Sequence, residues 1–146
     1  MINVSNRLVV FYADDDHDDL DTFRDVIEDI KNAELYTHDH GDKLIHALEN
    51  PPPVPHVVFL DLNMPGKNGF EVLQELRQKR DFKELPVVIL STSVDEQSIF
   101  TSKQLGANLY LPKASNYDKL KASVLHALKI DWNNYEPADS GFVYHT

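Results

Sequence analysis

Apolar runs alternate with amphipathic segments along most of this chain, which predicts strands and helices in turn. The runs at 8–13, 57–60 and 87–90 contain branched and aromatic residues without a polar break, as is typical of strands buried on both faces. Two shorter stretches, at 34–38 and 108–111, are weaker strand candidates. The pattern therefore predicts five strands, each followed by a helix.

Apolar residues recur at helical spacing between those strands. The first helix has an acidic first turn, as the helix dipole favours, and Asn68 is placed to cap the third helix. The fourth helix is expected to start at the capping-box spacing of Ser93 and Glu96 and to stop at Gly106. The apolar faces of the other four helices are formed by Leu20, Phe23, Ile27 and Ile30, by Leu44, Ile45 and Leu48, by Phe70, Leu73 and Leu76, and by Tyr117, Leu120, Val124 and Leu128.

Strands that alternate with helices form a mostly parallel sheet with helices on both faces. We therefore predict a doubly wound α/β domain at residues 1–130, in which the prolines at 51–53 and 55 form a stiff, extended connector. The residues after Ile130 are polar, contain aromatic side chains and lack periodicity. We interpret 131–146 as a C-terminal tail without a domain of its own, which either frays or docks on the domain or on a partner.

The charge and composition exclude several classes of protein. A net charge of -10 argues against nucleic acid or an anionic membrane as a binding partner, because both attract a basic patch, and the chain has none. The absence of cysteine excludes disulfides, thiolate metal sites and thiol nucleophiles. No apolar stretch approaches transmembrane length, and the N-terminus lacks the pattern of a secretory signal. We therefore expect a soluble, cytoplasmic protein.

Polar side chains stand at the carboxyl ends of the predicted strands. Asp14 and Asp15 follow the first strand, Asp61 follows the third, Ser91 ends the fourth and Lys113 follows the fifth. In a doubly wound sheet these ends meet at one crevice. Three carboxylates with one lysine repel one another, so a cation is expected among them, and Mg²⁺ prefers such oxygen ligands. Because an ammonium and a hydroxyl suit phosphoryl oxygens, the set predicts a site that places a phosphoryl group on, or beside, an aspartate.

Four segments, at 11–16, 58–69, 86–93 and 106–113, together look like the receiver domain of two-component response regulators. The most diagnostic string is Leu-Asp-Leu-Asn-Met-Pro-Gly at 60–66. The resemblance covers residues 8–129 and implies a flavodoxin-like strand order of 2-1-3-4-5, for which the chemotaxis receiver is a standard example. With no output domain in the sequence, the chain most resembles the stand-alone receivers.

The resemblance implies that Asp61 accepts a phosphoryl group from a histidine kinase or a phosphotransfer protein. Asp14 and Asp15 would bind Mg²⁺ together with Asp61 and the main-chain carbonyl of Asn63. The phosphorylated protein would then change its affinity for a downstream protein target, which the sequence does not identify. The only reactions that such a protein catalyses are its own phosphorylation and dephosphorylation.

The resemblance also assigns roles around the acceptor. Ser91 and Lys113 would each bind an oxygen of the phosphoryl group after transfer. Tyr110 falls on the aromatic switch position, whose ring turns inward when the hydroxyl residue moves toward the phosphoryl group. Asn63 and Ser93 occupy positions that tune attack by water on the phosphorylated form.

Two positions depart from the family pattern. Ala114 stands where the family usually has a proline after a cis peptide bond, and a cis bond before a non-proline residue costs about 3 kcal/mol. The exact placement of Lys113 is therefore not set by the resemblance. Thr92 stands where the family often has a smaller residue, so we expect it to narrow access to Asp61 and to slow transfer from small phosphodonors.

Two other functions remain open from the sequence. A Mg²⁺-dependent phosphohydrolase with an aspartate nucleophile would need a second carboxylate two residues after Asp61, where this chain has Asn63, and a cap domain to enclose its substrate. A receiver that no longer accepts a phosphoryl group would serve as an interaction module, but all the site residues of an active receiver are present.

Overall fold

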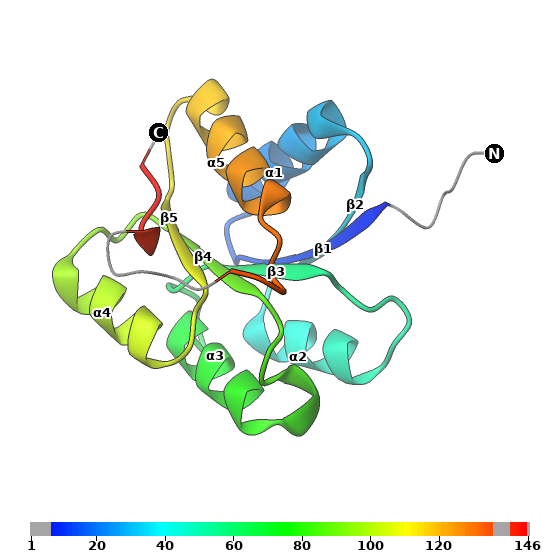
Figure 1. Ribbon diagram of the computed structural model, residues 1–146, viewed down its shortest axis with the longest axis vertical. Helices are drawn as coiled ribbons and strands as arrows, with labels where there is room; N and C mark the ends of the chain where they lie inside the picture. Colours follow the sequence, from blue (N-terminus) through cyan, green and yellow to red (C-terminus); the bar gives the residue numbers. More distant parts are fainter. Residues whose placement is uncertain (1–6, 136–140, 146) are drawn as a thin grey trace.

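The computed structural model describes residues 7–135 and 141–145 (Figure 1). In this part of the chain, five strands alternate with five α-helices, and a short 3-10 helix, η2 (Arg80–Phe82), precedes the fourth strand. None of the described helices is both long and apolar enough to cross a bilayer. The elements are β1 (Leu8–Ala13), α1 (His17–Ile30), β2 (Ala33–His38), α2 (Gly41–Glu49), β3 (Val57–Leu60), α3 (Gly69–Gln78), β4 (Val87–Ser91), α4 (Glu96–Gln104), β5 (Leu109–Pro112) and α5 (Tyr117–Lys129).

The sheet is parallel, and its strand order of β2-β1-β3-β4-β5 confirms the predicted flavodoxin-like topology. Helices α1 and α5 cover one face, and α2, α3 and α4 cover the other (Figure 1). Because the strands are parallel, their carboxyl ends all lie at the same edge of the sheet. The chain reverses its direction of winding between β1 and β3, which is where such sheets bind ligands.

Two apolar clusters, one on each face of the sheet, hold these layers together. Strand β3 contributes to both, since Val57 and Phe59 pack with residues of α1 and α5, while Val58 and Leu60 pack with residues of α2 and α3. All four side chains are at most 2% exposed. The uninterrupted apolar run is therefore buried on both faces, as predicted, and holds the residue that follows it in a fixed place.

The turn from β3 into α3 is fixed by a cap and by a glycine. Asn68 caps α3 as predicted, and its side chain and that of Glu71 bond each other's backbone N–H in a capping box. At Gly69, a Cβ atom would lie 2.3 Å from the carbonyl oxygen of Asp61. The helix can approach the strand end this closely only because residue 69 has no side chain.

The predicted start of α4 is wrong. The helix begins at Glu96, and Asp95 is its N-cap, accepting hydrogen bonds from the N–H and hydroxyl of Ser98. Ser93 instead belongs to the loop between β4 and α4, where its N–H binds the hydroxyl of Ser91. The predicted end is correct, since Gly106 follows the helix with a φ of +102°.

The predicted apolar faces are buried at their centres and partly exposed at their margins. Tyr117, expected to face inward, is 36% exposed, because its hydroxyl extends across to bond the carboxylate of Asp29 in α1. Ile30, Phe70 and Leu128 are half-buried against the two clusters. Among the apolar residues of these helices, the fully buried ones that the prediction omitted are Val26, Val72 and Ala127.

The described C-terminal segment, 141–145, lies alongside β5 (Figure 1). Val143 forms a parallel bridge with Tyr110, while Phe142 is 1% exposed and joins the cluster under α2 and α3. Tyr144 stacks on the ring of His126 in α5, with 3.8 Å between centroids. Of the outcomes considered for the tail, the described segment follows one: it docks on the domain.

Candidate functional site

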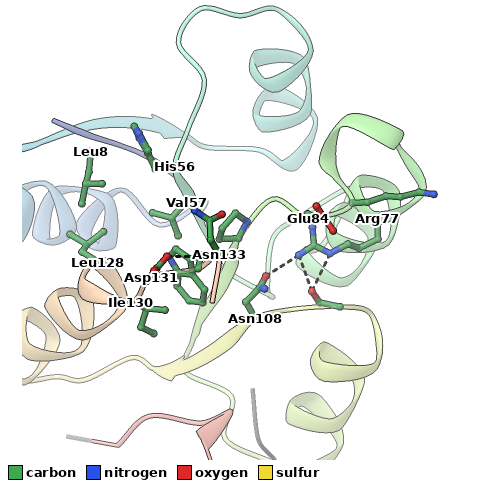
Figure 2. Close-up of a pocket in the computed structure, with 14 residues that line it drawn as sticks. Leu8, His56, Val57, Arg77, Glu84, Asn108, Leu128, Ile130, Asp131 and Asn133 are labelled. Atoms are coloured by element: carbon green, nitrogen blue, oxygen red, sulfur yellow. Dashed lines mark hydrogen bonds between the residues drawn. The ribbon is translucent and has the colours of Figure 1, made fainter. Parts of the chain in front are cut away.

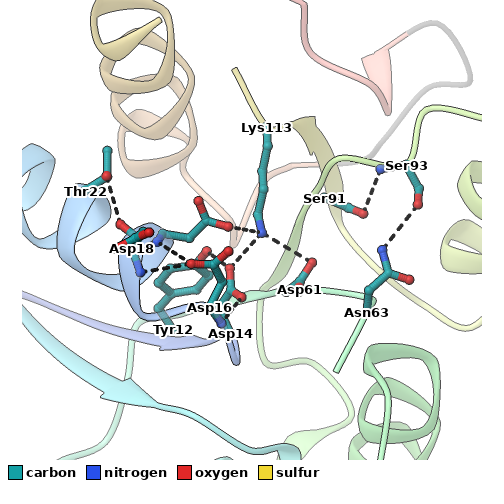
Figure 3. Close-up of polar contacts among 11 residues, drawn as sticks. Tyr12, Asp14, Asp16, Asp18, Thr22, Asp61, Asn63, Ser91, Ser93 and Lys113 are labelled. Atoms are coloured by element: carbon teal, nitrogen blue, oxygen red, sulfur yellow. Dashed lines mark hydrogen bonds and ion pairs between the residues drawn. The ribbon is translucent and has the colours of Figure 1, made fainter. Parts of the chain in front are cut away.

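The predicted site residues come together at the carboxyl edge of the sheet (Figure 3). Asp14 follows β1, Asp61 follows β3, Ser91 is the last residue of β4, and Lys113 follows β5. Backbone hydrogen bonds continue past the strand ends: the N–H of Asp61 binds the carbonyl of Ala13 at 3.0 Å, and that of Lys113 binds the carbonyl of Ser91 at 2.8 Å. The site is therefore built on the rigid end of the sheet.

Three carboxylates form the centre of the site. Oxygens of Asp14, Asp15 and Asp61 lie within 4.8 Å of one another. Asp14 is fully buried and Asp61 is 4% exposed, whereas Asp15 is exposed. The carboxylate of Asp14 accepts a hydrogen bond from the hydroxyl of Tyr12 and another, of 3.0 Å, from the N–H of Asp16. These two bonds fix its orientation.

The charge on Asp61 is disfavoured by its surroundings. Burial, followed by the neighbouring charge of Asp14, raises the pKa of Asp61 to about 7, although the ammonium of Lys113 and the backbone N–H of Asn63 act in the opposite direction. Burial, with the charge of Asp14, also raises the pKa of Tyr12 far above its ordinary value, so the phenol stays a hydrogen-bond donor. A cation placed among the carboxylates would relieve this repulsion.

The donor set fits a divalent metal ion. It consists of carboxylate oxygens on two neighbouring strand ends, and hard divalent cations prefer such oxygen ligands. Two of the three carboxylates are buried, so water screens their negative charges poorly. A cation bound between them would therefore stabilise their ionised forms strongly. Asp16, two residues after Asp14, is instead occupied as the N-cap of α1.

Lys113 lies within reach of this cluster. Its ammonium is 2.8 Å from the carboxylate of Asp14, 2.8 Å from that of Asp19 and 3.6 Å from that of Asp61. Burial lowers the pKa of Lys113, but the carboxylates outweigh this and raise it above its ordinary value. Among the described residues, cis peptide bonds occur only within 51–53, so the bond from Lys113 to Ala114 is trans. The lysine reaches the site without the family's usual proline.

The loop after β4 connects the site to Tyr110. The buried hydroxyl of Ser91 accepts the N–H of Ser93 at 3.1 Å, and the side chain of Asn63 donates to the hydroxyl of Ser93 at 3.4 Å. Tyr110 is fully buried, so its ring already points inward, and its hydroxyl donates to the carbonyl of Ser93 at 2.5 Å. Thr92 is exposed at the rim.

Two contributors to the site were missed from the sequence. Tyr12 lies two residues before Asp14, on the same side of the strand, so period-two spacing was the available signal. Asp19 belongs to the acidic first turn of α1, which was explained from the sequence by the helix dipole alone. Its pairing with Lys113 joins residues 94 positions apart, which no local pattern reveals.

A separate cavity lies at the opposite end of the sheet and contains none of these residues. It has a volume of 700 Å³ and lies between the amino ends of the strands and the end of α5 (Figure 2). Arg77 lines this cavity, and its guanidinium donates hydrogen bonds to the carbonyls of Phe82 and Gly106 and to the side-chain oxygen of Asn108. These bonds give Arg77 a structural role in joining α3 to the loop before β5.

Comparison with known proteins shows where this architecture recurs. Response regulator Rcp1 of Synechocystis sp. is 46% identical over 68 residues, which are 47% of this chain and 46% of that protein. The probable methanogenesis regulatory protein FilR2 of Methanothrix harundinacea is 30% identical over 82 residues, which are 55% of this chain and 53% of that protein. The matched part therefore spans about half the length of these curated relatives.

Solved structures match over a larger part of the chain. The Mn(2+)-bound form of Rcp1 has a TM-score of 0.75 and 30% identity, covering 90% of this chain and 99% of that one. The phosphorylated cyanobacterial phytochrome response regulator RcpA has a TM-score of 0.75 and 28% identity, covering 88% of this chain and 95% of that one. The sequence profile of the response regulator receiver domain matches residues 10–125. With this match over most of the chain, and with the fold and strand-end residues described above, the protein belongs to the response regulator receiver domain family.

Proposed function

We propose that Asp61 accepts a phosphoryl group from a histidine kinase or a phosphotransfer protein, and that this protein is a single-domain response regulator. The observation that carries the proposal is the position of Asp61 at the centre of the strand-end site. It lies 3.6 Å from the ammonium of Lys113 and beside the carboxylates of Asp14 and Asp15. Receiver domains accept phosphoryl groups from these donors, and RcpA, a structural relative, is known in a phosphorylated form.

The transfer is an in-line displacement on phosphorus. A carboxylate oxygen of Asp61 attacks the phosphorus of the donor phosphohistidine, and the P–O bond forms as the P–N bond breaks. The donor imidazole leaves with the electron pair and takes up a proton. Lys113 is placed to neutralise the charge that then lies on the phosphoryl group.

We assign the divalent metal ion to Mg²⁺, held by Asp14, Asp15, Asp61 and the main-chain carbonyl of Asn63. The all-oxygen donor set supports this assignment, and Rcp1 is known in a Mn(2+)-bound form. When bound, the ion supplies charge neutralisation on the phosphoryl oxygens. Asp14 enters this arrangement already oriented by Tyr12.

The phosphorylated state would be read at the face of α4, β5 and α5. In our proposal, the Ser91 hydroxyl and Lys113 bind phosphoryl oxygens, and the loop containing Ser93 follows Ser91. Tyr110 is bonded to that loop, so its ring senses the movement. A coupling of about 1–3 kcal/mol to a downstream protein is typical of such switches. Asn63 and Ser93 are in contact and would together tune attack by water on the acyl phosphate, the protein's own dephosphorylation.

The phosphohydrolase alternative is not favoured. Asn63 stands where a general acid would be needed, and it donates a hydrogen bond to Ser93 instead of offering a carboxyl proton. The described residues also form one sheet with its covering helices and include no separate cap over Asp61.

The test is to incubate the protein with Mg²⁺ and a phosphoramidate and to follow its intact mass. We expect a phosphoryl adduct on the wild type and on the control Asp118→Asn, an exposed change in α5, and no adduct on Asp61→Asn. An autophosphorylated histidine kinase serves as a second donor, because Thr92 is expected to slow small donors. Absence of an adduct with both donors would contradict the proposal, and sustained hydrolysis of unrelated phosphate esters would favour a hydrolase.

A further inference from the structure

The ammonium of Lys113 is held by carboxylates from different parts of the fold (Figure 3). Asp14, at the end of β1, and Asp19, in the first turn of α1, each approach it to 2.8 Å. Asp61, at the end of β3, lies further away at 3.6 Å. The lysine side chain is 13% exposed, so these carboxylates replace most of its contact with water.

Asp19 differs from the other two carboxylates in one respect. Asp14 and Asp61 belong to the cluster that fits a divalent metal ion, whereas Asp19 does not. An ion bound to that cluster would attract the oxygens of Asp14 and Asp61 and repel the ammonium. Three carboxylates of the described residues lie within 4 Å of the ammonium, those of Asp14, Asp19 and Asp61. With the ion bound to the other two, Asp19 is the one that remains free to hold the ammonium.

The lysine needs such a restraint because its stem is flexible and has space beside it. A lysine ammonium is carried on a four-carbon stem with considerable rotamer freedom. Next to the stem lies a cavity of 170 Å³, lined by Asp19, Lys113, Ala114 and residues of α1 and α5. The backbone of Asp19 is held in the first turn of α1, where its N–H donates to the N-cap side chain of Asp16 at 3.2 Å.

We propose that Asp19 is a positioning residue, which holds the ammonium of Lys113 beside Asp61 while a divalent metal ion occupies the carboxylate cluster. Asp19 touches neither the phosphoryl group nor the ion, and it acts only through Lys113. The inference rests on the proposed function of Asp61 for its catalytic consequence, but the placement of the ammonium can be measured without any phosphoryl transfer.

The first test compares Asp19→Asn with Asp18→Asn. Both changes remove one negative charge from the first turn of α1, and the exposed Asp18 carboxylate makes no described contact with Lys113. We expect Asp19→Asn to slow adduct formation on Asp61 about tenfold relative to Asp18→Asn, the size of one charge-assisted hydrogen bond. Asp19→Glu, which keeps the charge, should recover part of the rate. Equal rates for the two asparagine variants would overturn the inference.

The second test observes the ammonium directly, by NMR of protein labelled with ¹⁵N-lysine, with Lys113→Arg to assign the signal. In the presence of Mg²⁺, the wild type and Asp18→Asn should show a Lys113 ammonium protected from solvent exchange, and Asp19→Asn should lose that protection. Protection that persists in Asp19→Asn would overturn the inference. If the wild type forms no adduct with any donor, the proposed function fails, and this measurement alone decides the role of Asp19.

Discussion

At the scale of the residue, Asp61 is a carboxyl group whose ionised form the fold disfavours. Burial and the charge of Asp14 raise its pKa to about 7, whereas the ordinary value is 3.8. The folded protein therefore binds this proton more tightly than the unfolded chain does. The stability gained from that proton is complete below pH 3.8 and is lost as the pH rises through about 7. Above that range the metal-free protein holds two poorly screened carboxylates side by side.

We therefore expect Asp61→Asn to stabilise the metal-free protein, and the stabilisation should be larger at pH 8 than at pH 5. Between these two pH values, the gain in the free energy of unfolding should grow by about 2 kcal/mol. Urea titrations in the presence of a chelator measure this difference. Asp118→Asn, an exposed change, should show the same effect at both pH values. Saturating Mg²⁺ should reduce the advantage of the variant, and a pH-independent effect of Asp61→Asn would refute the electrostatic explanation.

Thr92 is exposed and directly follows Ser91 at the end of β4. The resemblance described above implies that the family often has a smaller residue at this position. We expect Thr92→Ala to raise the rate of adduct formation from a small phosphodonor, while the free energy of unfolding changes by less than about 0.5 kcal/mol, as for other surface positions. The rate from a histidine kinase serves as the comparison. An unchanged rate from the small donor would show that Thr92 does not restrict access.

At the scale of the element, the turn between β3 and α3 sets the distance from the helix to the acceptor. A Cβ atom at residue 69 would meet the carbonyl oxygen of Asp61 at 2.3 Å, and backbone atoms cannot move aside cheaply. Gly69→Ala should therefore lower the free energy of unfolding by about 1–3 kcal/mol, the usual effect of overpacking, and should also slow phosphorylation. Gly141→Ala, where a Cβ would meet nothing within 4 Å, is the matched control. If both variants unfold at the same urea concentration, the close approach is not a constraint.

The sequence predicts the elements well where one local signal dominates. The run at 57–60 has no polar residue, so neither face of this strand can be exposed to water favourably, and both faces are buried. The start of α4 was mispredicted because Ser93 and Asp95 are both good caps, and the choice depends on the bonds that Ser93 makes to the neighbouring loop. The strand-end site residues were correctly brought together, since a parallel topology requires it. The contact between Lys113 and Asp19 depends on side-chain placement across the fold, which periodicity does not encode.

At the scale of the whole molecule, the docked C-terminal segment extends the domain beyond its last helix. The carbonyl of Phe142 accepts the N–H of Tyr110 at 2.9 Å, and the N–H of Tyr144 donates to the carbonyl of Tyr110 at 3.0 Å. These bonds pair the outward-facing backbone groups of Tyr110 on β5, which is an edge strand of the sheet. The same Tyr110 bonds the loop that carries Ser93, so the segment is in physical contact with a chain of residues leading to Ser91.

Phe142 is the residue through which this docking can be measured. Its ring is 1% exposed and lies 6.2 Å from that of Tyr110, so truncation removes a fully buried aromatic side chain. We expect Phe142→Ala to lower the free energy of unfolding by about 3 kcal/mol. We also expect faster hydrogen exchange at the amide of Tyr110, because the carbonyl that accepts its bond lies on the released segment. The control is His145→Ala, an exposed change in the same segment, which should alter neither the free energy of unfolding nor the exchange of the Tyr110 amide. If Phe142→Ala gives the same two values as His145→Ala, the segment contributes nothing to the stability of the domain.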